Sequence, residues 1–308
     1  MMNTAFIFPG KGSQYVGMGG DLYEHYSDVQ ELYSEANEIL GFELSCVSFE
    51  GPEEQLKQTF ITQPAIFVHS VALIKLLSGK INARFAAGHS LGEYSALYYA
   101  GALNFKDCLK LVKNRGVLMQ EAGEKQKGTM AAIIGLDEKI VDSICQEALS
   151  EGIVQVANLN SPGQIVISGS ILGVRKAMGL SKLNKAKMVK ELIVHGAFHS
   201  PLMEPAKNKF KETLDIVKFN KVRIPVYTNV TGKHITEQTS PEEIKRLLYE
   251  QLTSPVRWQD CIINMISDGA EEFIELGPGK VLQGLVKRID STVVVRGFDK
   301  AEDLSTVS

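Results

Sequence analysis

The stretch between about residues 129 and 194 constrains the fold of this chain more than any other part of the sequence. Short apolar runs predict strands at 130–134, 153–157, 164–168 and 188–194, and helical spacing predicts helices at 137–149 and 172–180. The resulting order, β-α-β-β-α-β, is the ferredoxin-like pattern. We therefore expect a small ferredoxin-like (βαββαβ) unit at residues 128–195.

On either side of this unit, short strands alternate with helices. Strands are predicted at 5–8, 84–87, 224–228, 272–276 and 293–295, and helices at 22–40, from Pro64 to Leu77, from Glu93 onward and at 106–122. Such alternation indicates an α/β fold with parallel strand pairs. Residues 1–127 and 196–308 are expected to form one core that the small unit interrupts, with a ligand site in the cleft between them.

Composition excludes several classes of function. The 308 residues carry a net charge of −3, which argues against nucleic-acid binding through overall charge. No apolar run approaches the ~20 residues of a membrane span, and the N-terminus lacks the features of a signal peptide. The four cysteines, at 46, 108, 145 and 261, form no CxxC pair, so we expect free thiols in a reducing cytoplasm rather than disulfides or zinc ligands.

Gly88-His89-Ser90-Leu91-Gly92 is a GxSxG motif between a predicted strand and a predicted helix. In that setting the motif forms a sharp turn that exposes the serine, and its glycines relieve crowding. The amide after the serine, that of Leu91, then points toward a developing oxyanion at a helix N-terminus. This context favours Ser90 as a nucleophile over a glycine-rich turn with a capping serine. His89 adjoins the serine and is expected to support it rather than act as its base.

A serine nucleophile needs a base, and His199 is the strongest candidate among the six histidines. Ser200-Pro201 predicts the N-cap and first turn of a helix, so His199 lies where the positive end of a helix favours a neutral imidazole. His195 and His199 do not fit the zinc helix motif, because Gly196 follows the first histidine. The alternative role for His199 is an interface histidine with a structural hydrogen bond.

The helix predicted at 106–122 carries Arg115 within an apolar stripe, between Leu111 and Leu118. A guanidinium in such a place requires a planar anion held by two hydrogen bonds. The pattern does not decide between a carboxylate of the protein and a carboxylate of a substrate.

Two further patterns carry less weight. The turn at 9–14 fits neither a phosphate-binding loop nor a dinucleotide fingerprint, although its amides could supply a second oxyanion donor. The stretch 175–190 is rich in lysine and arginine, which suits either a solvated face or the docking of an acidic partner.

Eight short motifs lie in order along the chain. They are FPGKGSQ at 8–14, TQPA at 62–65, GHSLGEYS at 88–95, RG at 115–116, NSPGQ at 160–164, GAFHS at 196–200, QL with PV at 251–252 and 255–256, and ELGPGKVL at 275–282. Together they resemble the motifs of the malonyl-CoA:acyl carrier protein transacylases, from near residue 4 to about residue 289. The resemblance implies a hydrolase-like α/β core with an inserted ferredoxin-like small domain.

The resemblance also implies catalytic roles. Ser90 would attack the thioester of malonyl-CoA and hold the malonyl group as an ester. His199 would take the serine proton and later activate the phosphopantetheine thiol of an acyl carrier protein, which completes a ping-pong transfer through a Ser-His dyad. The main-chain carbonyl of Gln251, rather than an aspartate, would orient His199. The amides of Leu91 and Lys11 would form the oxyanion hole.

The substrate-binding residues follow from the same match. Arg115 would pair with the malonyl carboxylate and so select malonyl over acetyl, because acetyl leaves a buried guanidinium unpaired. Phe198 would leave little room for an α-methyl branch, and His89, Asn160 and Met119 are expected to complete the binding site. We expect no cofactor, no metal and no membrane contact, and a cytoplasmic monomer that meets an acidic carrier protein of fatty-acid or polyketide synthesis.

One position departs from the family, which normally has Gln where this chain has Lys11. The oxyanion role uses the backbone amide, while the added cation could strengthen carboxylate binding or point to solvent. From sequence we expect little loss of activity in Lys11→Gln. Two other classes of function compete: an acyl hydrolase that clears carriers, which the presence of Arg115 disfavours, and a non-catalytic docking module for an acidic partner.

Overall fold

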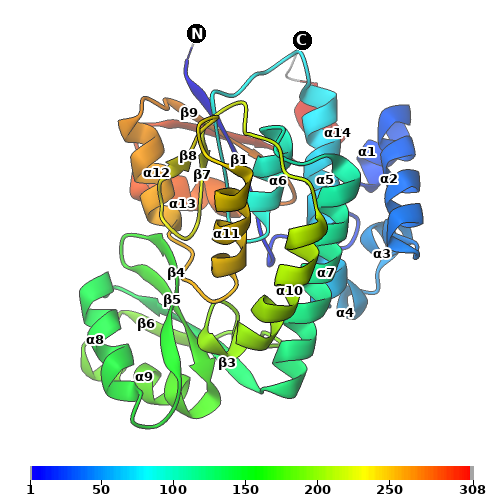
Figure 1. The fold of residues 1–308 in the computed structure, drawn as a ribbon. Coiled ribbons are helices and arrows are strands. Elements are labelled where there is room, and N and C mark those ends of the chain that lie inside the picture. The colour runs from blue at the N-terminus through cyan, green and yellow to red at the C-terminus, as the bar shows by residue number, and fades with distance from the viewer. Residues whose placement is uncertain (1, 306–308) are drawn as a thin grey trace.

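A computed structural model describes residues 2–305 and contains two β-sheets with helices packed around them (Figure 1). The larger sheet is formed by β1 (Thr4–Phe8), β2 (Phe85–Gly88), β7 (Val226–Tyr227), β8 (His234–Ile235), β9 (Glu272–Leu276) and β10 (Val294–Phe298). Its strands lie in the order β10-β9-β1-β2-β7-β8, and every neighbouring pair is parallel except the antiparallel edge pair β7–β8. The predicted α/β fold with parallel strands is confirmed.

Twelve α-helices and one 3-10 turn surround this sheet within residues 2–305. They are α1 (Gly20–His25), α2 (Ser27–Leu40), α3 (Leu44–Glu50), α4 (Glu53–Leu56), α5 (Thr59–Leu77), α6 (Gly92–Tyr99), α7 (Phe105–Lys125), η1 (Pro201–Met203), α10 (Glu204–Ile216), α11 (Pro241–Gln251), α12 (Trp258–Ser267), α13 (Val281–Ile289) and α14 (Ala301–Leu304).

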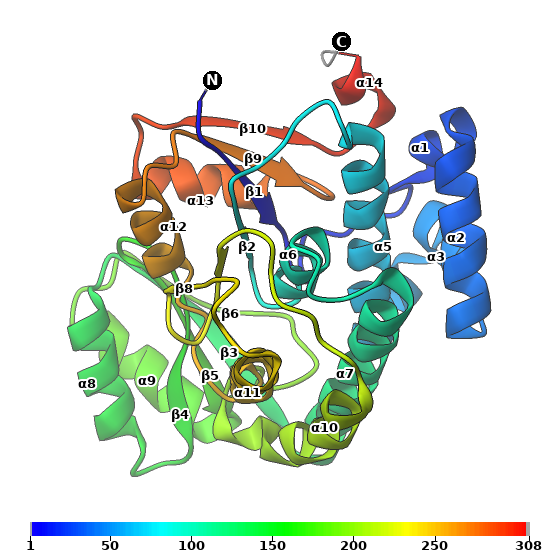
Figure 2. The same ribbon diagram turned by 45° about the horizontal axis from the view of Figure 1, so that its top comes forward.

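Both faces of the larger sheet are buried, as expected of parallel strands joined by helices. Side chains alternate along β1: Phe6 and Phe8 pack into the core built with α5, α6 and α7, whereas Ala5 and Ile7 pack into the core built with α12 and α13. Figure 2 shows these two groups of helices on either side of the sheet. The carboxyl ends of β1 and β2 meet at one edge, where their following turns are brought together.

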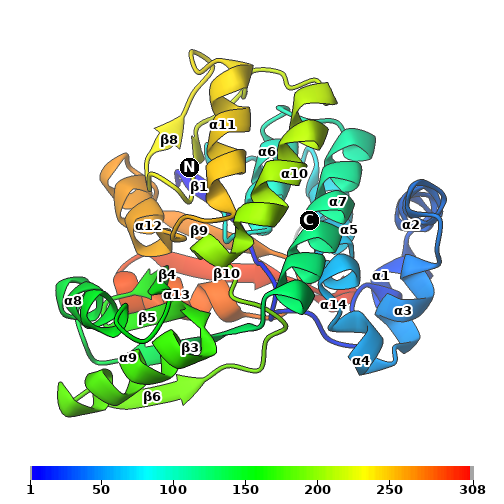
Figure 3. The same cartoon turned by 60° about the horizontal axis from the view of Figure 1, so that its bottom comes forward.

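The second sheet is formed by β3 (Gly128–Ile134), β4 (Val154–Ser161), β5 (Gln164–Ser170) and β6 (Met188–Glu191), with α8 (Glu138–Ala148) and α9 (Ile171–Leu183). Its order is β4-β5-β3-β6, with every neighbouring pair antiparallel. These elements gather in the green part of Figures 1 and 3. The element order β-α-β-β-α-β is the predicted one. β6 ends at Glu191, earlier than predicted: the Leu192 amide still donates to the Met130 carbonyl of β3 at 2.8 Å, but the side chains of Leu192 and Val194 pack against the main core.

A short bridge joins the small sheet to the segment that precedes α12. Asn158 in β4 pairs in parallel with Val256, just before α12. The Leu159 amide donates to the Val256 carbonyl at 2.9 Å, and the Val256 amide donates to the Ala157 carbonyl at 2.8 Å. This contact fixes the small sheet beside the carboxyl edge of the larger one.

Two predicted helices differ from the structure. The helix expected at 22–40 is broken into α1 and α2, because Tyr26 adopts an extended backbone (φ −130°, ψ 117°). The helix expected to begin at Pro64 begins at Thr59 instead, so the proline lies inside α5. The added first turn is held by the Thr62 hydroxyl, which donates to the Leu56 carbonyl at 2.5 Å. A proline near a helix start removes one internal bond, and burial offsets that loss.

Helix α5 is long and apolar enough, by length and composition alone, to cross a membrane. The expectation that no run approaches such a length was wrong for this segment. In the structure, 78% of its apolar window is buried inside the protein. Its apolar side chains thus serve the core between α7 and the larger sheet.

Candidate active site

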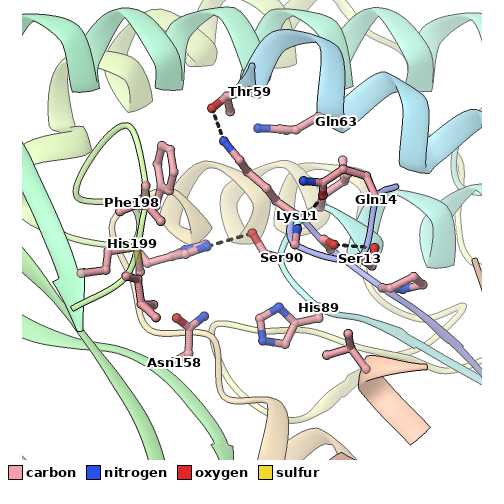
Figure 4. Close-up of a pocket in the computed structure, with 18 of the residues that line it drawn as sticks. Lys11, Ser13, Gln14, Thr59, Gln63, His89, Ser90, Asn158, Phe198 and His199 are labelled. Atoms are coloured by element: carbon pink, nitrogen blue, oxygen red, sulfur yellow. Dashed lines mark hydrogen bonds between the residues drawn. The ribbon is translucent and has the colours of Figure 1, made fainter. Parts of the chain in front are cut away.

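A cavity of about 560 Å³ lies at the carboxyl ends of β1 and β2, between the two sheets (Figure 4). Residues 9–14 and 89–91, which directly follow these strands, form part of its wall. Met130 and Asn158 line it from the small sheet, and Arg115 lines it from α7. The cleft predicted between the two parts of the chain is therefore present, and most of the predicted site residues meet in it.

Ser90 occupies the sharp turn between β2 and α6. Its backbone has φ 53°, a left-handed conformation that non-glycine residues rarely adopt. The turn requires glycine at both flanks: a Cβ on Gly88 would lie 1.8 Å from the Gly92 carbonyl carbon, and one on Gly92 would lie 2.0 Å from the Phe8 oxygen. Close packing of this kind holds the serine at the cavity wall in a fixed direction.

His199 faces the serine. Its Nε2 lies 2.8 Å from Ser90 Oγ, and its Nδ1 lies 2.8 Å from the main-chain oxygen of Gln251. Because a carbonyl oxygen can only accept, Nδ1 carries the proton and Nε2 is left to accept the proton of Ser90. Burial, followed by the charge of Arg115, lowers the pKa of His199 to about 3, so the imidazole is neutral at physiological pH. This geometry suits a general base.

The backbone of His199 is itself strained, with φ 56°. The Ser200 side chain caps η1 by accepting from the Leu202 amide, as the Ser-Pro pair predicts. Gln155 of β4 donates from its Nε2 to the His199 carbonyl at 2.8 Å and to the Thr253 carbonyl at 2.9 Å. The histidine is thus fixed from the small sheet as well as from the core.

Arg115 is 1% exposed and lies beside the serine. Its Nη2 donates to Ser90 Oγ at 3.0 Å and to Gln251 Oε1 at 2.9 Å, and its Nη1 donates to Gln63 Oε1 at 2.8 Å. Within residues 2–305 it forms no ion pair with a carboxylate, and its Nε has no hydrogen-bond partner. Of the two anions left open by the sequence, a substrate carboxylate is therefore the one this geometry favours.

A buried network joins the serine turn to the histidine. Glu93 accepts from the Asn229 amide at 2.9 Å and from Gln251 Nε2 at 2.8 Å, and burial raises the pKa of its carboxyl to about 7. Asn229 Oδ1 accepts from the Ser90 amide at 2.6 Å. These contacts join the Ser90 turn to Gln251, whose carbonyl oxygen contacts His199, and so help to fix the distance between Ser90 and His199. Glu93 lies in the GHSLGEYS motif, whereas no pattern in the sequence indicated a functional role for Asn229.

The remaining predicted residues lie at the same cavity. Within the described chain, the amides of Leu91 and Lys11 have no hydrogen-bond partner, as an oxyanion hole requires. His89 Nε2 lies 2.9 Å from Asn160 Oδ1 across the cleft. Burial lowers the pKa of His89, which fits a neutral support rather than a base.

Phe198 and Met119 line the cavity beside Arg115. Gln63, which was named from the sequence only as part of a motif, contacts both Arg115 and Met119. Its Oε1 accepts from Arg115, and its Nε2 lies 3.5 Å from Met119 Sδ. A polar residue within the apolar run of α5 is the signal that could have found it. Within residues 2–305, no group of three or more His, Cys, Asp or Glu side chains could hold a metal ion.

The fold and this site define a class: an α/β protein with a serine-histidine pair at a strand-to-helix turn. Comparison with known proteins gives a matching class, since residues 5–304 match the acyl transferase domain family. The malonyl CoA-acyl carrier protein transacylase of Bacillus subtilis is 47% identical over 292 residues, which cover 94% of this chain and 91% of that protein. The chain belongs to the malonyl-CoA:acyl carrier protein transacylase family.

Solved structures agree with this assignment. An acyl carrier protein S-malonyltransferase from Vibrio cholerae has a TM-score of 0.95 at 43% identity, covering 99% of this chain and 100% of that one. A malonyl-transacylase in complex with its type II PKS acyl-carrier protein has a TM-score of 0.94 at 40% identity, covering 99% of this chain and 98% of that one.

Proposed function

We propose that this chain transfers the malonyl group from malonyl-CoA to the phosphopantetheine thiol of an acyl carrier protein, through an ester on Ser90. One observation carries the proposal: Ser90 Oγ lies 2.8 Å from a neutral histidine nitrogen and 3.0 Å from a buried guanidinium that forms no ion pair within residues 2–305. The first contact suits a nucleophile, and the second suits an acyl group that ends in a carboxylate.

The residues divide the reaction as follows. Nε2 of His199 takes the hydroxyl proton while Ser90 Oγ bonds to the thioester carbon, and the amides of Leu91 and Lys11 donate to the oxyanion. The carbon–sulfur bond then breaks, and His199 returns the proton to the coenzyme A sulfur. In the second half, His199 takes the proton of the carrier thiol, whose sulfur bonds to the ester carbon. The bond between that carbon and Ser90 Oγ then breaks, and His199 returns the proton to Oγ.

The proposal extends to the architecture. A hydrolase-like core at 1–127 and 196–308, with a ferredoxin-like domain inserted at 128–195, is supported by the strand orders of the two sheets and by the confinement of the second sheet to residues 128–191. We assign the active form to a cytoplasmic monomer that needs no cofactor or metal. Its four free cysteines suit a reducing compartment.

Product analysis separates this proposal from the acyl hydrolase. The protein is mixed with malonyl-CoA, with and without a carrier that bears phosphopantetheine, and malonyl-carrier and free malonate are measured. Transfer predicts malonyl-carrier as the main product and little malonate when the carrier is absent. Steady release of malonate without carrier-dependent transfer would identify a hydrolase instead.

The basic stretch 175–190 is proposed as the docking face for the acidic carrier, and it lies on and after α9, where Lys185 and Lys187 are exposed. Reversing both lysines to Glu is expected to lower kcat/KM for the carrier about tenfold by weakening electrostatic steering, while acylation of Ser90 by malonyl-CoA is unchanged. The same reversal at the exposed Lys75 and Lys80 is the matched control. Equal loss in both half-reactions would contradict this assignment.

A further inference from the structure

The side chain of Lys11 lies inside the active-site cavity rather than in solvent. Its Nζ donates to Thr59 Oγ1 at 2.6 Å and lies 5.2 Å from the ring centroid of Phe198. Figure 4 shows the side chain extending past Ser90 toward Thr59. The ammonium therefore reaches the wall opposite the serine, away from the oxyanion site that the Lys11 amide would serve.

Helix α5 holds both this ammonium and the guanidinium of Arg115. Thr59 holds Lys11, and Gln63, which lies four residues later on the same helix face, holds Arg115 Nη1 at 2.8 Å. Side chains at this spacing have Cβ atoms about 5–6 Å apart. The two cations are thus held by successive turns of one helix, and both border the space in front of Ser90.

Neither cation forms an ion pair with a carboxylate in the part of the chain that the structure describes, although the charge of the buried Glu93, which lies beyond Gln251, acts on Arg115. Lys11 donates only to a neutral hydroxyl, and no carboxylate forms an ion pair with it or with Arg115. The other charged or titratable groups lining the cavity are Lys57, which is paired with Glu53 at 2.7 Å, and the three histidines His89, His195 and His199. Arg115 is buried and Lys11 is partly buried, so an anionic ligand between them offsets part of the cost of removing both cations from water.

Resting on the transferase function proposed above, we propose that Lys11 is a specificity-determining residue whose ammonium binds the free carboxylate of the malonyl group together with Arg115. A carboxylate has two oxygens with about four acceptor sites, so a guanidinium and an ammonium can share it. Leaving the neutral Thr59 hydroxyl for a charged oxygen strengthens the hydrogen bond of Lys11. An acetyl group offers no such acceptor, so the added lysine sharpens discrimination against it.

The test compares loading of Ser90 from malonyl-CoA and from acetyl-CoA in Lys11→Gln, Lys11→Met and Lys11→Arg. The Gln and Met variants are expected to lower kcat/KM for malonyl about tenfold or more, the effect of one charged hydrogen bond, and to lower the value for acetyl far less, so that the malonyl-to-acetyl ratio falls. The Arg variant, which keeps a positive charge, retains most of the malonyl preference. Lys75→Gln, an exposed lysine later on α5, controls for loss of charge elsewhere. This expectation replaces the small effect anticipated from sequence.

A pH profile adds a readout that a purely structural role would not move. Burial lowers the pKa of Lys11 to about 8. The ammonium is charged below that value and is lost as pH rises through it, so the malonyl-to-acetyl ratio should fall above pH 8 in the wild type and stay flat in Lys11→Arg and Lys11→Met. Equal losses for both donors, or no loss for malonyl, would overturn the proposal. A wild type that loads neither donor would instead reject the transferase function itself.

Discussion

His199→Ala is expected to slow acylation of Ser90 by malonyl-CoA about 10³-fold, within the range typical for loss of a general base. The reason is geometric: Nε2 of His199 lies 2.8 Å from Ser90 Oγ, and burial with the nearby charge of Arg115 holds its pKa at about 3, so it accepts a proton throughout the neutral range. The rate of coenzyme A release in a single turnover measures the effect.

The control for this variant is His25→Ala, which removes an exposed histidine of α1 far along the chain from the site. His25→Ala should match the wild type. Melting temperatures of both variants show whether the fold is kept, since His199 is 3% exposed. Acylation by His199→Ala within tenfold of the wild type would mean that another group removes the serine proton.

Arg115→Ala is expected to lower kcat/KM for malonyl-CoA by about 10²- to 10³-fold, because removing one member of a buried charged pair costs about 2–5 kcal/mol. Loading from acetyl-CoA should fall far less or rise, since acetyl gains nothing from the guanidinium. The malonyl-to-acetyl ratio, measured with both donors, is therefore the diagnostic quantity.

Two further variants separate the charge of Arg115 from its packing. Arg115→Met keeps much of the side-chain volume between Gln63 and Gln251 and should lose the malonyl preference as fully as the alanine variant does. Arg115→Lys keeps the positive charge but not the planar pair of N–H donors, and it should show an intermediate loss of the malonyl preference. Equal losses for malonyl and acetyl in all three variants would show that Arg115 supports the fold rather than the choice of substrate.

The parts of this molecule that follow local rules could be predicted from the sequence. The Ser90 turn depends on two glycines and on strand and helix patterns on either side, all within a few residues. His199 was found because Ser200 and Pro201 mark a helix start. The order of strands and helices along the small unit followed from apolar runs and helical spacing, which are local features.

Other features depend on contacts between distant segments, which spacing does not reveal. Asn229 lies 139 residues from Ser90 in sequence yet accepts from its amide. The extended backbone of Tyr26 and the early start of α5 likewise depend on packing with other elements. The ammonium of Lys11 is the sharpest case, because only the placement of Thr59 and Phe198 around it shows that it enters the cavity.

The central claim is that Ser90 carries the malonyl group between coenzyme A and the carrier. Intact-mass spectrometry of the protein after mixing with malonyl-CoA tests it most directly, beside Ser90→Ala. We expect a malonyl-sized mass gain in the wild type, none in Ser90→Ala, and passage of that mass to a phosphopantetheine-bearing carrier when it is added. An adduct of equal size in Ser90→Ala, or a wild-type adduct that the carrier does not remove, would contradict it.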